Sequence, residues 1–411
     1  MSNDLITPSI IAKEALVQLD NNLTMANNVH REYKKEFVKV GDTVSIRKPV
    51  KFYAADGATR VNQDVEEANT SITINQQKHV SWGFSSKDMT LTIEDYSERY
   101  IKPAMIALAN TIDRSGHQLY KKVWNHVGTP GTTPADFAAM AEAAQRMDEM
   151  AVPSDMRKAI LNPAAGYEIA GTATALYMRQ IAQDAYRRGS IGEIAGLETF
   201  KSQNVTSHIV GAHGGTPLVN GGTQASTYAN TKNTNSQSLV TDGWPNSVTG
   251  VLKAGDVFTI AGVFAMNPVP GEGSTGKIQM PYLQEFVVLA DANSDGTGNA
   301  TLSISPAIIT SGPYQTVSAQ PVDDAVITVK TGTAGAAYPQ NLMFHKNAFA
   351  LVMCPLELPD GVSFKARESY KGLSVRVVKQ YDIDSDTDVI RLDVLFGWEA
   401  IYRELACRRT G

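Results

Sequence analysis

Two short segments of the chain carry residue types at spacings that could bind a ligand. Residues 271–277, GEGSTGK, match six positions of a phosphate-binding P-loop, but Ile278 stands where a magnesium-binding Ser or Thr belongs. Pro268, Pro270 and Pro281 flank the segment and leave no place for the helix whose N-terminus would hold the phosphate. We therefore expect a solvent-exposed loop at this position.

The second segment resembles the first half of a calcium-binding loop. Asp291, Asn293 and Asp295 stand at ligand positions, but the twelfth position, which needs a bidentate Glu, is Leu302. An Asp-Gly pair such as Asp295-Gly296 between two strand candidates is typical of a hairpin turn. We predict a turn, with adventitious cation binding as the alternative.

Other groups of polar residues offer weak support for chemistry. Four carboxylates could hold a metal or a basic partner: Asp382, Asp384, Asp386 and Asp388. Their segment lacks the glycine of a calcium loop, so we predict a solvated hairpin tip. The seven histidines show no HExxH pairing and no cysteine at ligand spacing. Without a GxSxG elbow or a recognisable Cys–His set, we expect no enzyme, no metal and no cofactor. A hydrolase with a dispersed site stays an alternative.

Composition narrows the class of protein. The chain has 411 residues, of which 43% are hydrophobic and 19% charged, which suits a folded protein with a sizeable core. A formal net charge of −5 argues against a general phosphate-binding surface. Two cysteines, Cys354 and Cys407, are too few for a disulfide framework. No apolar run reaches about 18 residues, so we expect no membrane span and no export signal.

Periodicity predicts helices and strands in mixed order. A short amphipathic helix should follow Thr7-Pro8, and alternating apolar residues over 38–46 and 72–84 indicate the two arms of one long polar hairpin. An apolar stripe spaced by three, four or seven predicts a helix over about 96–124. Further helices are expected after Asp136 through Met150, over 164–177 and over 180–188.

Charge is unevenly distributed along the chain. Only 12 of the 137 residues in 204–340 are charged, against 67 of the other 274. This stretch alternates with period two, as in 257–260, 285–289 and 300–304, which predicts an inserted β-barrel or sandwich. The α/β pattern then resumes with strands at 349–353, 373–377 and 390–396. The sheets should therefore be completed by residues from the far side of the insert.

This order of elements resembles a known family, the HK97-fold major capsid proteins of tailed double-stranded DNA phages, and in particular the branch of the phage P22 coat protein. The most specific likeness is residues 252–263, LKAGDVFTIAGV, which are similar to an insertion-domain strand pair of the form M-K-x-G-D-x-x-x-x-A-G-V. The hairpin at Asp295-Gly296 is similar to an Asp-Gly turn of that domain.

The resemblance implies an α+β, HK97-like fold with an inserted all-β barrel. It divides the chain into an N-terminal arm with a helix (1–36), an extended β-hairpin loop (37–84), a peripheral domain with the spine helix (85–134), the first part of an axial domain (135–203), the β-barrel insertion (204–340) and the return strands of the axial and peripheral domains (341–411).

The implied function is self-assembly into an icosahedral shell through a scaffold-assisted procapsid that expands as DNA is packaged. The implied partners are other copies of the chain, a scaffolding protein, a portal protein and a decoration protein. The shell would contact packaged DNA only non-specifically. No cofactor is implied. We expect the chain to lie in the host cytoplasm before assembly and in the virion capsid afterwards.

Two sets of residues are candidates for contacts in such a shell. Glu14 and Asp20 could dock a basic scaffolding helix, with a solvated helix face as the alternative. The extended loop should contact a neighbouring subunit through Lys48, Lys51, Arg60, Asp64, Glu66 and Glu67. A carbohydrate- or cell-surface-binding protein is the alternative from another class, because the polar insert contains Trp244, Tyr282 and Tyr314.

Overall fold

The computed structural model forms two compact units. One unit comprises residues 1–45, 71–116 and 349–399, and the other comprises 46–70, 117–348 and 400–411. The structure describes residues 8–32, 43–54, 57–63, 65–85, 97–175, 192–269, 277–362, 364–384 and 387–411. The helix predicted over 180–188 and the Gly-rich residues 271–276 lie outside these ranges.

The first unit is built on a five-stranded sheet. Its strand order is β16 (Phe349–Met353), β19 (Thr387–Ala400), β18 (Leu373–Asp382) and β17 (Phe364–Tyr370), and β3 (Gln76–Ser85) also pairs with β19. Helix α1 (Pro8–Asn22) packs against β17 and β18. The expected buried strand at 349–353 and the expected hairpin with its acidic turn are confirmed.

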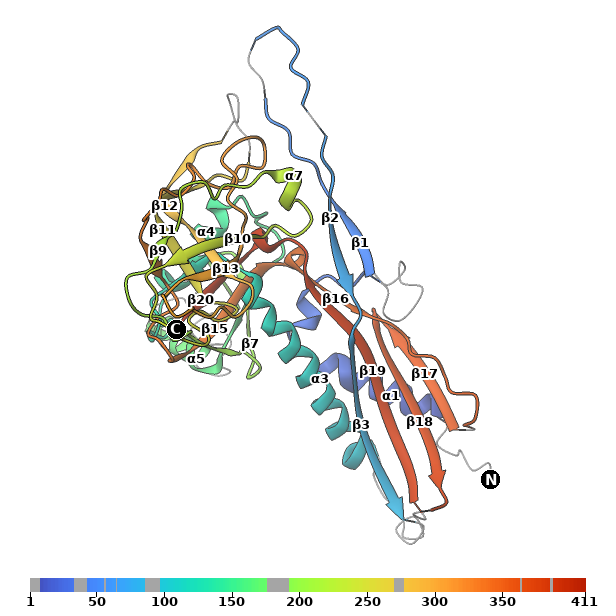
Figure 1. Cartoon of the computed structure of the whole chain (residues 1–411). Helices are drawn as coiled ribbons and strands as arrows, with labels where there is room; N and C mark the ends of the chain where they lie inside the picture. The colour runs from blue at the N-terminus through green and yellow to red at the C-terminus, as the bar shows by residue number, and fades with distance from the viewer. Residues whose placement is uncertain are drawn as a thin grey trace, which may run out of the picture. The chain divides into compact units, whose positions relative to one another are not determined.

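The long hairpin is where the structure differs from the prediction. Strand β1 (Thr43–Lys48) pairs with β2 (Ala68–Thr73), but β3 leaves this pair and runs beside β19 over ten residue pairs (Figure 1). A residue with a side chain at Gly397 would place its Cβ 2.3 Å from the carbonyl oxygen of Thr73, so the glycine allows the two backbones to approach. The predicted hairpin is therefore confirmed for β1 and β2 and wrong for β3, because alternation identifies a strand face and not its partner.

The predicted spine helix is shorter than expected. Helix α3 spans Lys102–His117, with a π turn at Ser97–Ile101 before it and a 3₁₀ turn at Gln118–Lys122 after it. Pro103 lies in the first turn of α3, where its missing N–H costs no helical hydrogen bond. The carboxylate of Asp113, on this helix, accepts hydrogen bonds from the backbone N–H groups of Thr24, Met25 and Ala26, at 2.6, 3.2 and 3.1 Å.

The second unit contains a seven-stranded sheet. Its strand order is β4 (His126–Val127), β20 (Ala406–Thr410), β15 (Ala337–His345), β5 (Arg157–Leu161), β7 (Leu197–Lys201) and β6 (Glu193–Ile194), and β8 (Ser207–Ile209) also pairs with β15. Because β15 and β20 follow the insert and β5 precedes it, the sheet is completed from the far side of the insert, as expected.

Two helices of this unit were predicted. Helix α4 (Phe137–Glu149) begins at Asp136, whose side chain accepts from the Ala139 N–H at 2.8 Å, and helix α5 spans Pro163–Ala175. The apolar residues of α4 and α5 pack together with those of the sheet, including Met140, Met147 and Leu161.

The expected β-barrel is present within the insert. Its strand order is β14 (Ile327–Val329), β11 (Val257–Met266), β12 (Gln279–Val288), β13 (Ala300–Ser305), β10 (Gln237–Asp242) and β9 (Leu218–Val219), with the short helix α7 (Tyr228–Thr231) before β10. Leu218 bridges to Val326, so the first and last strands meet and the sheet closes around its own core. The division into six domains stays a prediction.

The described part of the chain has no helix that is both long enough and apolar enough to cross a bilayer.

The Asp113 carboxylate should hold the segment after α1 on helix α3. Asp113→Asn replaces one acceptor oxygen by an amino group that faces N–H donors, so we expect a loss of about 2–3 kcal/mol in the free energy of unfolding. Asp136→Asn is the matched control, since Asn caps a helix as well as Asp does. Urea unfolding checks both variants, and equal losses would contradict the assignment.

Candidate functional site

The loop between β1 and β2 is the first candidate for a functional surface. Phe52, Val61 and Val65 on this loop are 54%, 50% and 63% exposed. The Tyr53 N–H donates to Gln63 Oε1 at 3.0 Å, and Gln63 Nε2 donates back to the Tyr53 carbonyl at 2.7 Å. The loop is thus braced across its middle by polar contacts while its apolar side chains face solvent.

The predicted contact residues of this loop lie apart from one another. Lys48 Nζ lies 5.8 Å from the ring centre of Tyr402, and the Lys51 N–H donates to the Tyr314 hydroxyl at 2.9 Å. Glu66 lies 4.0 Å from Lys232, and Glu67 pairs with Arg47 at 3.4 Å. Arg60 is exposed, and Asp64 lies outside the described residues.

The two candidates for scaffold docking are half-buried on α1. The Asp20 carboxylate lies 3.8 Å from Arg31 and 3.9 Å from Lys371, and Gln18 Nε2 lies 3.5 Å from Glu14 Oε1. Basic residues of the chain itself therefore already face Asp20. A role in scaffold contact stays a prediction for both residues.

The residues of the calcium-loop-like segment have structural roles. Asp295 accepts from the N–H groups of Thr297 and Asn299, at 2.8 and 2.9 Å, as an aspartate in a turn does. Asp291 and Asn293 each accept a backbone N–H, from Ala254 and Gly250. Within the described ranges, no three His, Cys, Asp or Glu side chains gather as a metal site.

The acidic turn between β18 and β19 is likewise a hairpin tip. Asp388 pairs with Lys379 at 3.2 Å, and Asp382 Oδ1 accepts from the Asp384 N–H at 3.2 Å. Asp386 lies outside the described residues.

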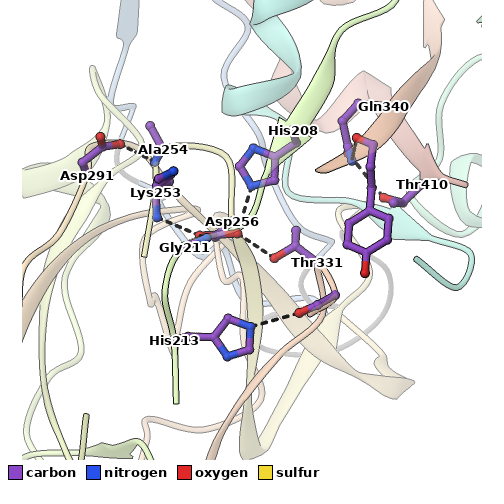
Figure 2. A network of polar contacts seen from close by, with 12 residues as sticks. His208, Gly211, His213, Lys253, Ala254, Asp256, Asp291, Thr331, Gln340 and Thr410 are labelled. Atoms are coloured by element: carbon purple, nitrogen blue, oxygen red, sulfur yellow. Dashed lines mark hydrogen bonds and ion pairs between the residues drawn. The ribbon is translucent and has the colours of Figure 1, made fainter. Parts of the chain in front are cut away.

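A buried carboxylate joins the barrel to the seven-stranded sheet, and sequence analysis missed it. Asp256, directly before β11, is 0% exposed, and His208 of β8 is 2% exposed. Asp256 Oδ1 accepts from His208 Nε2 at 2.9 Å and from Thr331 Oγ1 at 2.7 Å. Asp256 Oδ2 accepts from the N–H groups of Lys253 and Gly211, at 2.7 and 3.0 Å (Figure 2). Four donors from four segments therefore converge on one carboxylate.

Electrostatics favour the ionised form of this carboxylate. Burial alone would raise the pKa of Asp256, but the hydrogen bonds from His208, Lys253 and Thr331 outweigh it and hold the pKa below its usual value. Because a carboxylate only accepts, His208 donates through Nε2, and its Nδ1 lies 3.1 Å from the Tyr120 hydroxyl. Burial raises the pKa of Tyr120 to about 12, so its hydroxyl keeps its proton.

A Tyr–His–Asp chain resembles the relay of an acid–base catalyst, but here it is sealed inside the protein. Both His208 and Asp256 are buried, and the Arg408 guanidinium, 0% exposed, lies 5.9 Å from the ring centre of Tyr120. Burial lowers the pKa of Arg408 to about 10, with Asp256 and Glu285 acting in the opposite direction. The buried Arg408 guanidinium nitrogens have no hydrogen-bond partner among the described residues, and the buried His208–Asp256 pair is not open to a substrate.

A second buried ion pair holds the barrel on helix α4. Glu285 of β12 lies 3.2 Å from Arg146, and Glu285 Oε2 also accepts from the His126 N–H at 2.8 Å. The Arg146 guanidinium stacks on the Tyr282 ring at 3.8 Å. Burial raises the pKa of Glu285, although Arg146 acts against this shift.

The segment 252–263 contains the signal that could have identified the junction. Gly255 has a φ of +107°, and a Cβ there would lie 3.0 Å from the Tyr120 ring and 3.2 Å from the His208 ring. Asp256 follows it as one of few charged residues in the insert, with apolar neighbours on its C-terminal side. In this Gly-Asp pair, Gly255 makes the backbone turn and Asp256 supplies the buried hydrogen-bond acceptor.

Asp256→Asn should destabilise the protein by about 2–4 kcal/mol, because one amide replaces an oxygen that accepts two N–H groups. The folded pKa of Asp256 lies below its unfolded value of about 3.9, so its stabilisation is present above about pH 4 and lost as the pH falls further. Urea unfolding between pH 8 and pH 3 should show a constant difference from the parent that shrinks below about pH 4. A difference independent of pH would contradict this account.

Gly255→Ala should destabilise the protein by about 2–3 kcal/mol, because a Cβ there meets both positive φ and the Tyr120 ring. Gly262→Ala, at φ +79° with no atom near its Cβ, should cost only about 1 kcal/mol. Thermal unfolding of both variants checks the difference. Equal losses would mean that close packing on Tyr120 and His208 does not matter.

The comparisons with known proteins agree with this architecture. A family model described as P22 coat protein, gene protein 5, matches residues 2–406. The major capsid protein of Acyrthosiphon pisum secondary endosymbiont phage 1 is 25% identical over 276 residues, which are 66% of this chain and 64% of that protein. The match thus spans slightly less than two thirds of this relative's length.

A solved structure shows the same fold. A chain from Mycobacterium phage Che8 superposes with a TM-score of 0.50 at 14% identity, over 94% of this chain and 90% of that chain. A chain from the capsid structure of the cyanophage P-SCSP1u reaches 0.43 at 12% identity, over 90% and 84%. The HK97-like α+β fold expected from the order of elements is confirmed. With nearly all of its residues matched by the family model, the chain belongs to the P22 coat protein family.

Proposed function

We propose that this chain is the major coat subunit that assembles, in many copies, into the icosahedral shell around packaged phage DNA. Membership of the coat protein family supports this proposal. The single observation that carries it is the loop between β1 and β2, on which three large apolar side chains face solvent. Several large apolar side chains exposed on one loop favour a surface that a partner buries.

The loop also has the composition of an intersubunit contact. Its apolar residues Phe52, Val61 and Val65 lie among the charged residues Arg60, Glu66 and Glu67. An apolar centre with a charged rim is the usual anatomy of a protein interface. In a closed, symmetric assembly every subunit has neighbouring copies of itself. A neighbouring copy is therefore the partner that we propose for this loop.

The remaining partners belong to the same proposal. A scaffolding protein would dock on α1 near Glu14 and Asp20, with Asp20 exchanging its contacts to Arg31 and Lys371 for basic residues of the scaffold. A portal protein and a decoration protein would join the shell. The shell would contact the packaged DNA without specific interactions. The chain would occupy the host cytoplasm before assembly, and the shell would expand on packaging.

The residues that suggested two alternatives from other classes make internal contacts in the structure. The hypothesis of carbohydrate binding relied on exposed aromatic rings. Trp244, however, is buried and donates through Nε1 to Thr241 Oγ1 at 2.8 Å. Tyr282 lies under Arg146, and Tyr314 stacks on Tyr228 with 3.5 Å between ring centres. The Tyr120–His208–Asp256 chain, whose residue types could serve a hydrolase, has its His208 and Asp256 buried. We propose a structural, non-enzymatic role.

The double variant Val61→Asp/Val65→Asp tests the loop as an intersubunit contact. Two carboxylates in a desolvated interface should lower the yield of shells at least about tenfold. The variant should keep the unfolding transition of the parent, because both side chains are exposed within the chain. Sedimentation velocity and negative-stain microscopy on protein co-expressed with its scaffolding protein measure the yield.

Val240→Asp is the control, since Val240 is an exposed valine of the barrel strand β10. It reports what one added surface charge does outside the loop, and we expect shells at the parental yield. Shells of normal yield from the double variant would contradict the assigned role of the loop.

A further inference from the structure

A cavity of about 150 Å³ lies within the second compact unit, between the start of the loop 49–67 and the barrel. Four of its lining residues are lysines, which come from three segments of the chain. Lys48 and Lys51 belong to the loop side, Lys232 follows helix α7, and Lys277 precedes strand β12. The volume is several times the share of one water in the liquid, about 30 Å³, so a small ion with its water fits.

The cavity carries an excess of positive charge. Glu404 is the acidic side chain among the residues that line it. Lys277 Nζ donates to the Gln315 carbonyl at 2.7 Å, and Lys51 Nζ donates to the Pro268 carbonyl at 3.4 Å. Both acceptors are neutral, and an ammonium has three N–H groups, so each lysine keeps donors for a further acceptor.

The described ion pairs of this region leave Lys51 and Lys277 uncompensated. Lys232 faces Glu66 at 4.0 Å, but within the residues that the structure describes neither Lys51 nor Lys277 takes part in an ion pair. Burial lowers the pKa of Lys277 to about 7, and the Lys51 ammonium shifts it in the same direction. Two ammonium groups that destabilise each other in a cavity form a site that an anion would stabilise.

Phenol groups complete the set of donors. Tyr228, Tyr314 and Tyr402 line the cavity, and Tyr228 and Tyr314 stack face to face. Burial raises the pKa of Tyr228 and of Tyr402, so both hydroxyls stay protonated at neutral pH. The Tyr228 and Tyr314 hydroxyls hydrogen-bond to each other, so the lysine ammonium groups are the main donors for an acceptor that has several oxygen atoms.

We propose that this cavity binds a small tetrahedral oxyanion of the phosphate or sulfate class, which holds the start of the loop 49–67 on the barrel. The lysines of the loop and of the barrel would contact the same anion from opposite sides. The proposal does not depend on shell formation, since every residue that it uses lies within one unit of one chain.

Titration calorimetry with sodium sulfate on the full-length chain tests the proposal, with sodium chloride at equal ionic strength as reference. We expect saturable binding to one site, weakened at least about tenfold by Lys277→Met or Lys51→Met. Lys102→Met, which removes an exposed lysine of α3, should bind sulfate like the parent. Sulfate keeps its charge between pH 6 and pH 8, so tighter binding at pH 6 would report the protonation of Lys277.

The stability of the same variants separates lost binding from lost folding. In chloride, Lys277→Met should unfold at or above the parental temperature, because it removes a half-buried ammonium. In sulfate, the parent and Lys102→Met should gain stability and Lys277→Met should not. The proposal is overturned if the folded parent shows no saturable sulfate binding at pH 6, or if Lys277→Met and Lys102→Met bind sulfate equally.

Discussion

The Asp256 carboxylate is the interaction on which the second compact unit depends. It receives four hydrogen bonds from donors on β8, on the segment after β8, on the turn before β11 and on the segment after β14. These segments begin and end the barrel, so one buried charge fixes the barrel at both of its connections. Removing one partner of Asp256 leaves a buried charge or a buried donor unpaired, which costs free energy. The hydrogen bonds therefore favour this one arrangement of the four segments.

This anchoring explains how an insert can interrupt a sheet without disrupting it. Strands β5 and β7 precede the barrel, and β15 and β20 follow it, yet all belong to one sheet. The ion pair between Glu285 and Arg146 ties a barrel strand to helix α4 at a second point. The barrel is therefore tied into the fold of its own chain at two points.

Much of the fold followed from local patterns, because alternation and helical stripes report burial directly. The strands at 373–382 and 387–400 and the capped helix after Asp136 were predictable for that reason. The partner of β3 was not, since Val80 and Trp82 alternate in the same way whichever strand they pair with. Asp256 lay inside the most recognisable segment of the chain, but its role depends on His208 and Thr331, which are distant in sequence and met only in the folded chain.

The central claim is that this chain builds a closed shell from many copies of itself. Cryo-electron microscopy of particles from cells that co-express the chain with its scaffolding protein tests it most directly. The account predicts closed icosahedral particles in which the loop between β1 and β2 lies against a neighbouring copy. Particles in which this loop contacts no other subunit, or a chain that stays monomeric beside its scaffolding protein, would contradict it.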